Sequence, residues 1–494
     1  MRAWWTILLT AALAAEIAAQ DGNPPPAQPE AKPAEEPKEP PAWKIPERDV
    51  RKIEVPLDEF LRGDPKDRAD LLKKIEKAVE KPVDGHSMLE DVTGLVAIAN
   101  HARNFNPKLK KGQVQEIPVA PEVHGFPAIG TVKYWLYVPK EYREDNLWPL
   151  LFCLPDQKKY GDGKKYVEDW VAKSPAVAES FLVVVPQPQA KGAQWTTPAS
   201  LARAMVSLRH AAGTYGIDRK EAGPATDYLR VFIDGEDEAS VIAARFPEVF
   251  AGAILRGADG RAGGPNVAAT GQLSGMPAFC VVDPKSKAQR EFAQKIAERN
   301  EATVVVEDAS LEGNPTAMGV WMTKLPARAA QPKDIGYTVH DGSFQRHYWI
   351  NIMDFDASYK PAASFKAVAD RSKNDVTVEV EGISRFEIFL SDALVDLSRP
   401  VRIVVMEEGR ELPFFTTKDG RDTLSRDLGT MLAELLDSNH PWRIYPVKLV
   451  VNVAELRART PEEAPPEEGA DKPAEGGKPA GGENGKPQST EAAK

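Results

Sequence analysis

The sequence predicts an α/β protein: a mainly parallel sheet with helices on both faces, plus a small N-terminal helical module and a C-terminal mainly β domain. Three observations predict it. Between residues 113 and 328, strand-like and helix-like segments alternate along the chain. Several strand-like segments, such as 148–156, are continuous apolar runs, which are typical of parallel strands covered on both faces. After about residue 330, helix-like segments become scarce and alternating strand-like segments follow one another.

The two ends of the 494-residue chain have compositions that do not predict a packed core. Residues 1–20 carry one early arginine, an apolar run and then small residues, which predicts a cleaved signal peptide. The run is short for a membrane span and contains Glu16, although an uncleaved anchor is the alternative. Residues 21–46 and 458–494 are rich in Pro, Ala and Glu, which predicts a disordered linker and a disordered tail. We therefore expect an exported protein that is periplasmic, cell-surface or extracellular and, once mature, does not span a membrane.

Three folded regions are expected between these ends. Apolar residues at helical spacing predict a helical module over 50–110, in which Leu89, Val92, Leu95 and Ile98 share one face. The α/β region spans 113–328. Residues 332–457 predict a β-sandwich-like domain interrupted by one helix at 422–437.

Charge and cysteine content exclude some classes of function. The net charge is -10 and no basic stretch is present, which disfavours nucleic-acid binding. The two cysteines, Cys153 and Cys280, lie in apolar strand-like runs, so we expect buried free thiols. A disulfide is permitted in an exported protein but would require two core strands to approach closely. No metal or cofactor is expected.

One stretch, which starts at Leu229, reads LRVFIDGEDEASVIAARFPEVFAGAI: a hydrophobic strand, a sharp turn and a helix. Together with KYWLYVPKEYREDNLWPLLFCLP upstream, it resembles the α/β-hydrolase superfamily. More narrowly, it is similar to secreted esterases and to polyhydroxybutyrate-depolymerase-like or dienelactone-hydrolase-like proteins. The resemblance covers about 115–328, less than half of the chain. It implies a nucleophile at the tip of the turn, an oxyanion hole after an earlier strand, and an acid and a histidine after later strands.

The turn keeps the shape of the family motif but not its nucleophile. In the family the motif is G-x-S-x-G, whose small residues let a strand and a helix pack closely. Gly235 is retained, Ala239 replaces the second glycine, and Asp237 replaces the serine. Ser240 lies three positions further on, inside the predicted helix, and cannot stand in for it. The resemblance therefore implies an elbow without a serine nucleophile.

Asp237 has two interpretations. Some members of the superfamily use an aspartate here, because a carboxylate can attack carbon and form an ester intermediate that an activated water then cleaves. Alternatively, Asp237 with Asp234, Glu236 and Glu238 complements the dipole of the following helix and caps its free N–H groups. Aspartate also tolerates a strained turn better than most residues. The second interpretation is the simpler one, and the spacing matches no calcium loop.

The partners that the resemblance implies are also altered. No histidine follows the strand at 302–308; the next are His340 and His347, in the β domain. Asp283 occupies a position similar to that of the family acid, although an Asp-Pro turn after a strand is ordinary loop chemistry. The oxyanion loop at 154–157 reads Leu-Pro-Asp-Gln. Proline has no N–H to donate, and the aspartate would repel a developing oxyanion.

The sequence therefore predicts a pseudoenzyme: an exported, esterase-like protein that has lost its Ser-His-acid triad and oxyanion hole and acts as a non-catalytic binding or scaffold protein. One alternative is a hydrolase that uses Asp237 as nucleophile, with His340 or His347 supplied by the β domain. Another is a cell-envelope interaction protein that works through its terminal modules. The ligand or envelope partner is not specified by any local pattern.

Overall fold

The computed structural model describes residues 43–62, 65–91, 95, 109–143, 148–161, 163–190, 192–215, 228–229, 231–261, 273, 275–325, 328–329, 331–339, 346–356, 363–438 and 444–459. The predicted signal peptide and most of the predicted linker and tail lie outside these residues. Within the described ranges, no helix combines the length and apolar character that crossing a membrane requires.

The N-terminal region is helical, as predicted. It contains α1 (Glu47–Arg62), η1 (Pro65–Asp67), α2 (Arg68–Val79) and η2 (Met88–Glu90). Leu71, Ile75 and Val79 of α2 recur every four residues and are buried, which is the pattern of a helix with one apolar face. The α1 helix begins at Glu47, slightly before residue 50, where the helical module was predicted to start. Of the predicted face between 89 and 98, Leu95 is helical and buried, whereas residues 92 and 98 lie outside the described residues.

The central feature is an eight-stranded sheet with the order β1-β2-β4-β3-β6-β7-β8-β9. Its strands are β1 (Val114–Val119), β2 (Val132–Tyr137), β3 (Leu150–Leu154), β4 (Leu182–Pro186), β6 (Val231–Gly235), β7 (Phe250–Arg256), β8 (Ala278–Val282) and β9 (Val304–Glu307). The β2 strand is antiparallel to both of its neighbours, and all the other pairings are parallel. Two short strands, β5 (Tyr228–Leu229) and β10 (Arg328–Ala329), pair separately.

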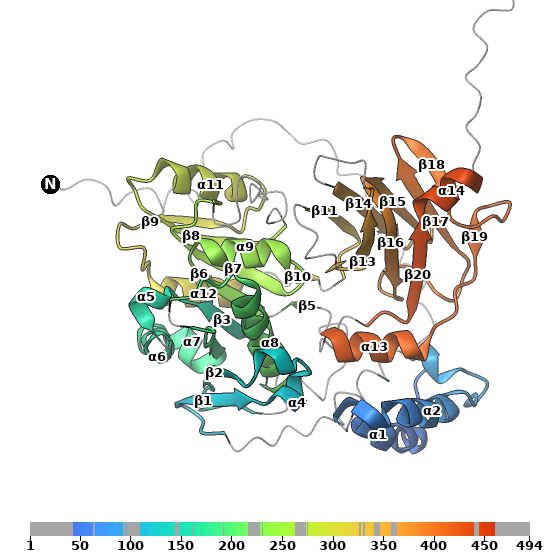
Figure 1. Ribbon diagram of the computed structural model, residues 1–494, viewed down its shortest axis with the longest axis horizontal. Helices are drawn as coiled ribbons and strands as arrows, with labels where there is room; N and C mark the ends of the chain where they lie inside the picture. The colour runs from blue at the N-terminus through green and yellow to red at the C-terminus, as the bar shows by residue number, and fades with distance from the viewer. Residues whose placement is uncertain are drawn as a thin grey trace, which may run out of the picture. The chain divides into compact units, whose positions relative to one another are not determined.

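Helices cover both faces of this sheet (Figure 1), and each face has its own apolar core. One core includes residues of α8 (Pro198–Tyr215), α9 (Asp237–Arg245) and α11 (Lys287–Ala297). The other includes residues of α6 (Lys164–Lys173), α7 (Pro175–Ser180) and α12 (Pro315–Lys324). Shorter helices are α4 (Pro121–His124), η3 (Pro127–Ile129) and α5 (Gln157–Tyr160). Every residue of β3, β4, β6 and β8 is buried, as a parallel sheet covered on both faces requires.

The strand order and the strand–turn–helix at β6 and α9 make this the α/β-hydrolase fold, so the predicted fold class is confirmed. The predicted strands and the helices α8, α9 and α11 are all present. Five helices of this region, α4, α5, α6, α7 and α12, were not predicted from the sequence. Three of them, α5, α6 and α12, contribute side chains to the site described below.

The C-terminal region is mainly β, as predicted, and consists of two sheets. Their orders are β11-β14-β15-β17-β18, with β19 paired to β17, and β12-β13-β16-β20. Residues from both sheets share one apolar core, which includes Trp349, Val378 and Phe386. The elements are β11 (Asp334–Val339), β12 (Arg346–His347), β13 (Ile350–Phe355), β14 (Ala363–Asp370), β15 (Asp375–Glu381), β16 (Ile383–Leu390), β17 (Val401–Glu407), β18 (Arg410–Pro413), β19 (Arg421–Asp422), α13 (Leu428–Ser438), β20 (Val447–Asn452) and α14 (Val453–Arg459).

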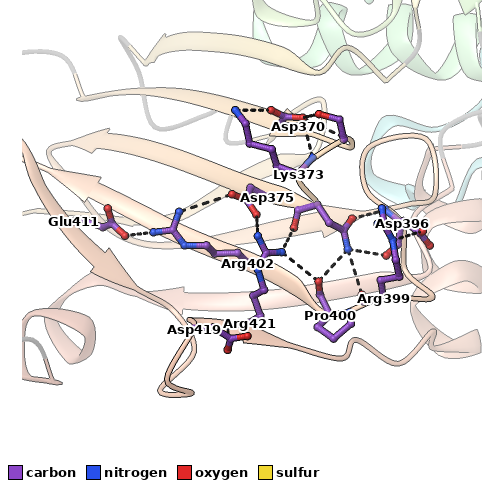
Figure 2. A network of polar contacts seen from close by, with 12 residues as sticks. Asp370, Lys373, Asp375, Asp396, Arg399, Pro400, Arg402, Glu411, Asp419 and Arg421 are labelled. Atoms are coloured by element: carbon purple, nitrogen blue, oxygen red, sulfur yellow. Dashed lines mark hydrogen bonds and ion pairs between the residues drawn. The ribbon is translucent and has the colours of Figure 1, made fainter. Parts of the chain in front are cut away.

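A polar network fixes the turn between β14 and β15 (Figure 2). Asn374 has a positive φ of 60°, a conformation that asparagine adopts more readily than most residues. Its buried amide donates hydrogen bonds to the backbone carbonyls of Asp396, Arg399 and Pro400. Arg421 binds the adjacent Asp375 at 2.5 Å. The Asn374 contacts attach the loop before β17 to the start of β15, its parallel neighbour, and the Arg421 ion pair attaches β19 to the same point.

Candidate functional site

The turn between β6 and α9 is closely packed, which explains the small residues of the motif. A Cβ atom at Gly235 would lie 2.7 Å from the carbonyl oxygen of Leu154 in β3 and 2.9 Å from the Cβ of Ala239 in α9. Both distances are too short for real contacts, so the glycine lets β6 approach its neighbours. The predicted close packing at the elbow is therefore present.

The backbone of this turn, in contrast, is not strained. Glu236 precedes the helix with φ -86° and ψ -153°, and Asp237 is already the first residue of α9. None of residues 235–239 has a positive φ. The expectation that aspartate is present because it tolerates a strained elbow is therefore wrong, since the strained turn that exposes a nucleophile in the hydrolase motif is not formed here.

The side chain of Asp237 binds a neighbouring loop. Its Oδ1 accepts hydrogen bonds from the backbone N–H groups of Asp259, at 3.1 Å, and Gly260, at 2.9 Å, in the loop after β7. The hydroxyl of Ser240 also approaches this oxygen, at 3.4 Å, while donating to the Asp237 carbonyl at 2.6 Å. Asp237 thus holds the β7 loop against the start of α9.

The Glu238 carboxylate binds a different loop. It accepts the backbone N–H of Trp195 at 2.9 Å and the Thr196 hydroxyl at 3.2 Å, both in the segment before α8. Glu236 occupies the N-cap position but makes no capping hydrogen bond with its side chain. The N-cap residue therefore does not cap the helix with its side chain, whereas Asp237 and Glu238 lie in the first turn, where their charge suits the dipole, and bind other elements.

Asp234, the last residue before Gly235, is the centre of a buried polar network. Its carboxylate is fully buried and accepts hydrogen bonds from the Tyr166 hydroxyl at 2.6 Å and the Trp170 indole N–H at 2.8 Å. Arg256, at the end of β7, forms an ion pair with it at 2.8 Å. The Arg256 guanidinium also lies over the Trp170 ring, 5.4 Å from its centroid. Each oxygen of this carboxylate therefore has a specific partner, as a buried charge requires.

The pKa values of the network follow from burial and charge. Burial is the largest single influence on the pKa of Arg256 and lowers it, but the charge and hydrogen bond of Asp234, with smaller contributions from neighbouring groups, together exceed it and raise the pKa of the guanidinium. Burial raises the pKa of the Tyr166 hydroxyl well above its usual value, so it remains a neutral donor. Burial and then the charge of Asp234 also raise the pKa of Cys153, which is a buried free thiol, as is Cys280. The predicted free thiols are thus confirmed.

The predicted acid position is occupied by a turn. Asp283 follows β8, and its side chain accepts the backbone N–H of Lys285 at 2.9 Å. Its own backbone N–H donates to the Gln289 side chain at 2.8 Å. These contacts are those of an Asx-turn after a strand, the ordinary loop chemistry that the sequence left open.

The described residues place neither of the two histidines that were predicted partners of Asp237 at the elbow. His347 is 3% exposed, and its ring stacks on Tyr337 and packs edge-on against Tyr348 and Phe365 within the β domain. His340 lies outside the described residues. His210 of α8 hydrogen-bonds the Tyr134 hydroxyl at 2.9 Å, and burial lowers its pKa to about 4.

A pocket of about 220 Å³ lies at the carboxyl ends of β3, β6 and β7, next to the elbow. It is lined by the elbow, the loop after β3, helices α5 and α6, and the loop after β9: Pro155, Asp156, Lys159, Tyr160, Tyr166, Asp169, Trp170, Lys173, Gly235, Glu236, Arg256, Ser310, Leu311, Glu312, Gly313 and Pro315. In α/β sheets, ligands bind beyond the carboxyl ends of the strands. No histidine is among these lining residues, and Asp237 is not among them either.

The loop after β3 borders this pocket with Pro155 and Asp156. Asp156 caps α5 by accepting the backbone N–H of Lys158 at 2.8 Å. The Pro155 carbonyl accepts the Trp195 indole N–H at 3.1 Å. Partial burial, and then the negative charge of Asp156, raise the pKa of Glu236. This side of the pocket therefore presents two carboxylates, where a hydrolase presents N–H donors.

Comparison with known proteins finds similarity only to solved structures, at low sequence identity. The sequence matches no family model and no curated protein. Among solved structures, it is similar to a thermostable esterase, with 20% identity and a TM-score of 0.30, over 42% of this chain and 59% of that one. A fungal esterase from Rhizomucor miehei matches with 10% identity and a TM-score of 0.32, over 50% and 93%. An S-formylglutathione hydrolase from Staphylococcus aureus matches with 12% identity and a TM-score of 0.32, over 44% and 99%.

Several residues of the site were missed by sequence reasoning. Tyr166 and Trp170 lie on α6, whose spacing of Tyr166, Val167 and Trp170 at i, i+1 and i+4 is a helical signal in an otherwise charged segment. Arg256 ends a strand whose other residues are buried, so a cation there indicated a buried partner.

Proposed function

We propose that this chain is an exported, non-catalytic α/β-hydrolase-like protein that acts as a binding or scaffold protein. The observation that carries this proposal is the environment of Asp237. The carboxylate at the nucleophile position accepts two backbone N–H groups of the β7 loop and lies in an ordinary helical turn. The nucleophile of the hydrolase motif lies instead at the tip of a sharp, strained strand-to-helix turn.

The other positions of the hydrolase site support the same proposal. The acid position is an Asx-turn, and two carboxylates face the pocket where N–H donors would stabilise an oxyanion. The fold still provides a pocket at the carboxyl ends of the strands, so binding is the function that remains open to it.

The alternative hydrolase, with Asp237 as nucleophile, now depends on His340 alone, because His347 is enclosed by aromatic rings of the β domain. The second alternative, of a different class, is a cell-envelope interaction protein. It predicts that the full chain captures an envelope component and that variants lacking either terminal module do not.

The experiment that tests the proposal is an ester-hydrolysis assay on the mature protein. We expect no turnover of p-nitrophenyl acetate above buffer, and none in Asp237→Ala. The same variant should lower the free energy of unfolding by about 1–3 kcal/mol, since two backbone donors lose their acceptor. Turnover that Asp237→Ala abolishes and that Glu238→Gln retains, with both variants folded by circular dichroism, would refute it.

Export is tested separately. We expect N-terminal sequencing of the protein from a producing cell to begin near residue 20 and the protein to fractionate outside the cytoplasm. A cytoplasmic protein with residues 1–20 intact would contradict this part of the proposal without affecting the part on catalysis.

A further inference from the structure

The pocket is bordered by a carboxylate of the chain itself, held between cations. Glu312 belongs to the loop after β9, and its Oε1 lies 3.0 Å from the Lys159 ammonium of α5. Its Oε2 lies 3.9 Å from the Lys173 ammonium of α6. Both lysines and Glu312 line the pocket. One carboxylate thus bridges two lysines that come from separate helices.

Arg256 adds a third positive charge, which binds the backbone of the same residue. Its Nη1 donates to the backbone carbonyl of Glu312, and its Nη2 has the Met318 sulfur, a weak acceptor, at 3.4 Å. The hydrogen bond from Lys159, followed by the charges of Lys159, Lys173 and Arg256, lowers the pKa of Glu312. Three cations from α5, α6 and β7 therefore favour a carboxylate at this point.

The contact that fills this position is easily exchanged. The side chains of Glu312, Lys159 and Lys173 are each about half exposed, at 49%, 51% and 49%. Exposed ion pairs of this kind contribute little to stability, so separating them costs little. A carboxylate on a ligand that also buries apolar surface could take the place of Glu312.

The walls of the pocket indicate what such a ligand carries besides its carboxylate. Tyr160 and Tyr166 meet edge to face, with ring centroids 4.6 Å apart, and Trp170 and Leu311 also line the cavity. Aromatic walls of this kind suit a flat, apolar body. On the elbow side, Asp156 and Glu236 would repel a second negative charge.

We propose that this pocket binds a small aromatic monocarboxylate, whose anionic group displaces the Glu312 carboxylate from Lys159 and Lys173. The inference rests on the proposed binding function and names the ligand class of the same pocket. Its distinctive consequence is a competition between ligand and Glu312, so removing the Glu312 charge strengthens binding, whereas removing a lysine charge weakens it.

The test uses the full mature chain at pH 7, with benzoate as the probe and benzyl alcohol as its uncharged counterpart, in calorimetric or NMR titrations. We expect saturable binding of benzoate and at least about tenfold weaker binding of benzyl alcohol. Glu312→Gln should bind benzoate about two- to fivefold more tightly, because an exposed competing pair is removed. Lys159→Met should bind it about fivefold or more weakly.

Matched controls lie close to both positions. Glu307→Gln removes an exposed acid of β9 that does not line the pocket, and Lys158→Met removes the lysine next to Lys159 that does not line it either. Both should leave benzoate affinity unchanged. Absence of saturable benzoate binding, or binding that Glu312→Gln leaves unchanged or weakens, overturns the inference. Tighter binding of benzylamine than of benzoate also overturns it, because the site would then select a cation.

The result is separable from the proposed lack of catalysis. Benzoate has no bond that a hydrolase could cleave, so its titration is independent of turnover. Ester hydrolysis together with benzoate competition would refute the non-catalytic function and leave the ligand class standing. Absence of both hydrolysis and benzoate binding would leave the non-catalytic function standing and refute the ligand class.

Discussion

Replacing Arg256 tests how much its buried ion pair with Asp234 contributes to the stability of the protein. Arg256 is 12% exposed and supplies the only ion pair that the described residues give to Asp234, which is 0% exposed. In Arg256→Met, Asp234 keeps two neutral donors, Tyr166 and Trp170, but its charge is left uncompensated inside the protein. Breaking one side of a buried pair costs about 3–5 kcal/mol, and we expect a loss of that size in the free energy of unfolding.

Urea unfolding at pH 7, followed by tryptophan fluorescence, measures this loss. With a slope of about 2 kcal/mol per molar urea, the midpoint of Arg256→Met should fall by about 2 M. Lys287→Met is the control: it removes an exposed i,i+4 pair on α11 and should change stability by less than about 0.5 kcal/mol. The double variant Asp234→Asn with Arg256→Met should lose less than the sum of the single losses, because no charge is then left buried. A loss below about 1 kcal/mol in Arg256→Met would refute the reasoning.

Three further predictions concern single buried positions. Gly235→Ala should destabilise the protein by about 1–3 kcal/mol, because the new Cβ atom would lie 2.7 Å from a β3 carbonyl oxygen. Gly336→Ala in β11 is the control, since the nearest atom to its new Cβ is 3.6 Å away and we expect no comparable loss. Thermal melts compare the two variants, and equal losses of stability would contradict the packing argument. Because burial lowers the pKa of His210 to about 4, the unfolded chain binds more protons between about pH 6.5 and 4, so stability falls as pH falls through that window, by roughly 3 kcal/mol. His210→Gln should flatten that part of the urea-stability profile, and an unaltered slope would show another group to be responsible. Finally, burial raises the pKa of both thiols, that of Cys280 to about 12. Neither Cys153 nor Cys280 should therefore react with a disulfide reagent at pH 8 until urea unfolds the protein. Rapid reaction of the folded protein with the reagent would show that a strand opens.

The sheet could be predicted because its signal is local. Strands such as β3 and β4 are uninterrupted apolar segments, and the α8, α9 and α11 helices have clear apolar spacing. The α6 helix was missed because only three of its ten residues, Tyr166, Val167 and Trp170, form its buried face. Helices of this kind form because the sheet offers a surface to cover, which is a tertiary effect that propensity alone does not reveal.

The position of the elbow could be predicted, but the roles of its acids could not. Gly235 and Ala239 reflect a close approach that depends on neighbours along the chain and on one adjacent strand. The partners of Asp234, by contrast, are 22, 64 and 68 positions away in sequence. A run of acids looks the same whether its members cap a helix, hold a cation or anchor loops, because the difference lies entirely in those distant partners.

The four acids of the elbow can lie close together because they contact different parts of the protein. Four carboxylates within five residues repel one another unless each is matched to its own donors. Asp234 faces Arg256 and α6, Asp237 faces the loop after β7, and Glu238 faces the segment before α8. Glu236 alone borders the pocket, where Asp156 opposes its charge. Three of the four acids at this turn therefore hold surrounding elements in place, and the ligand site that we propose lies beside the fourth, at the cationic border around Glu312.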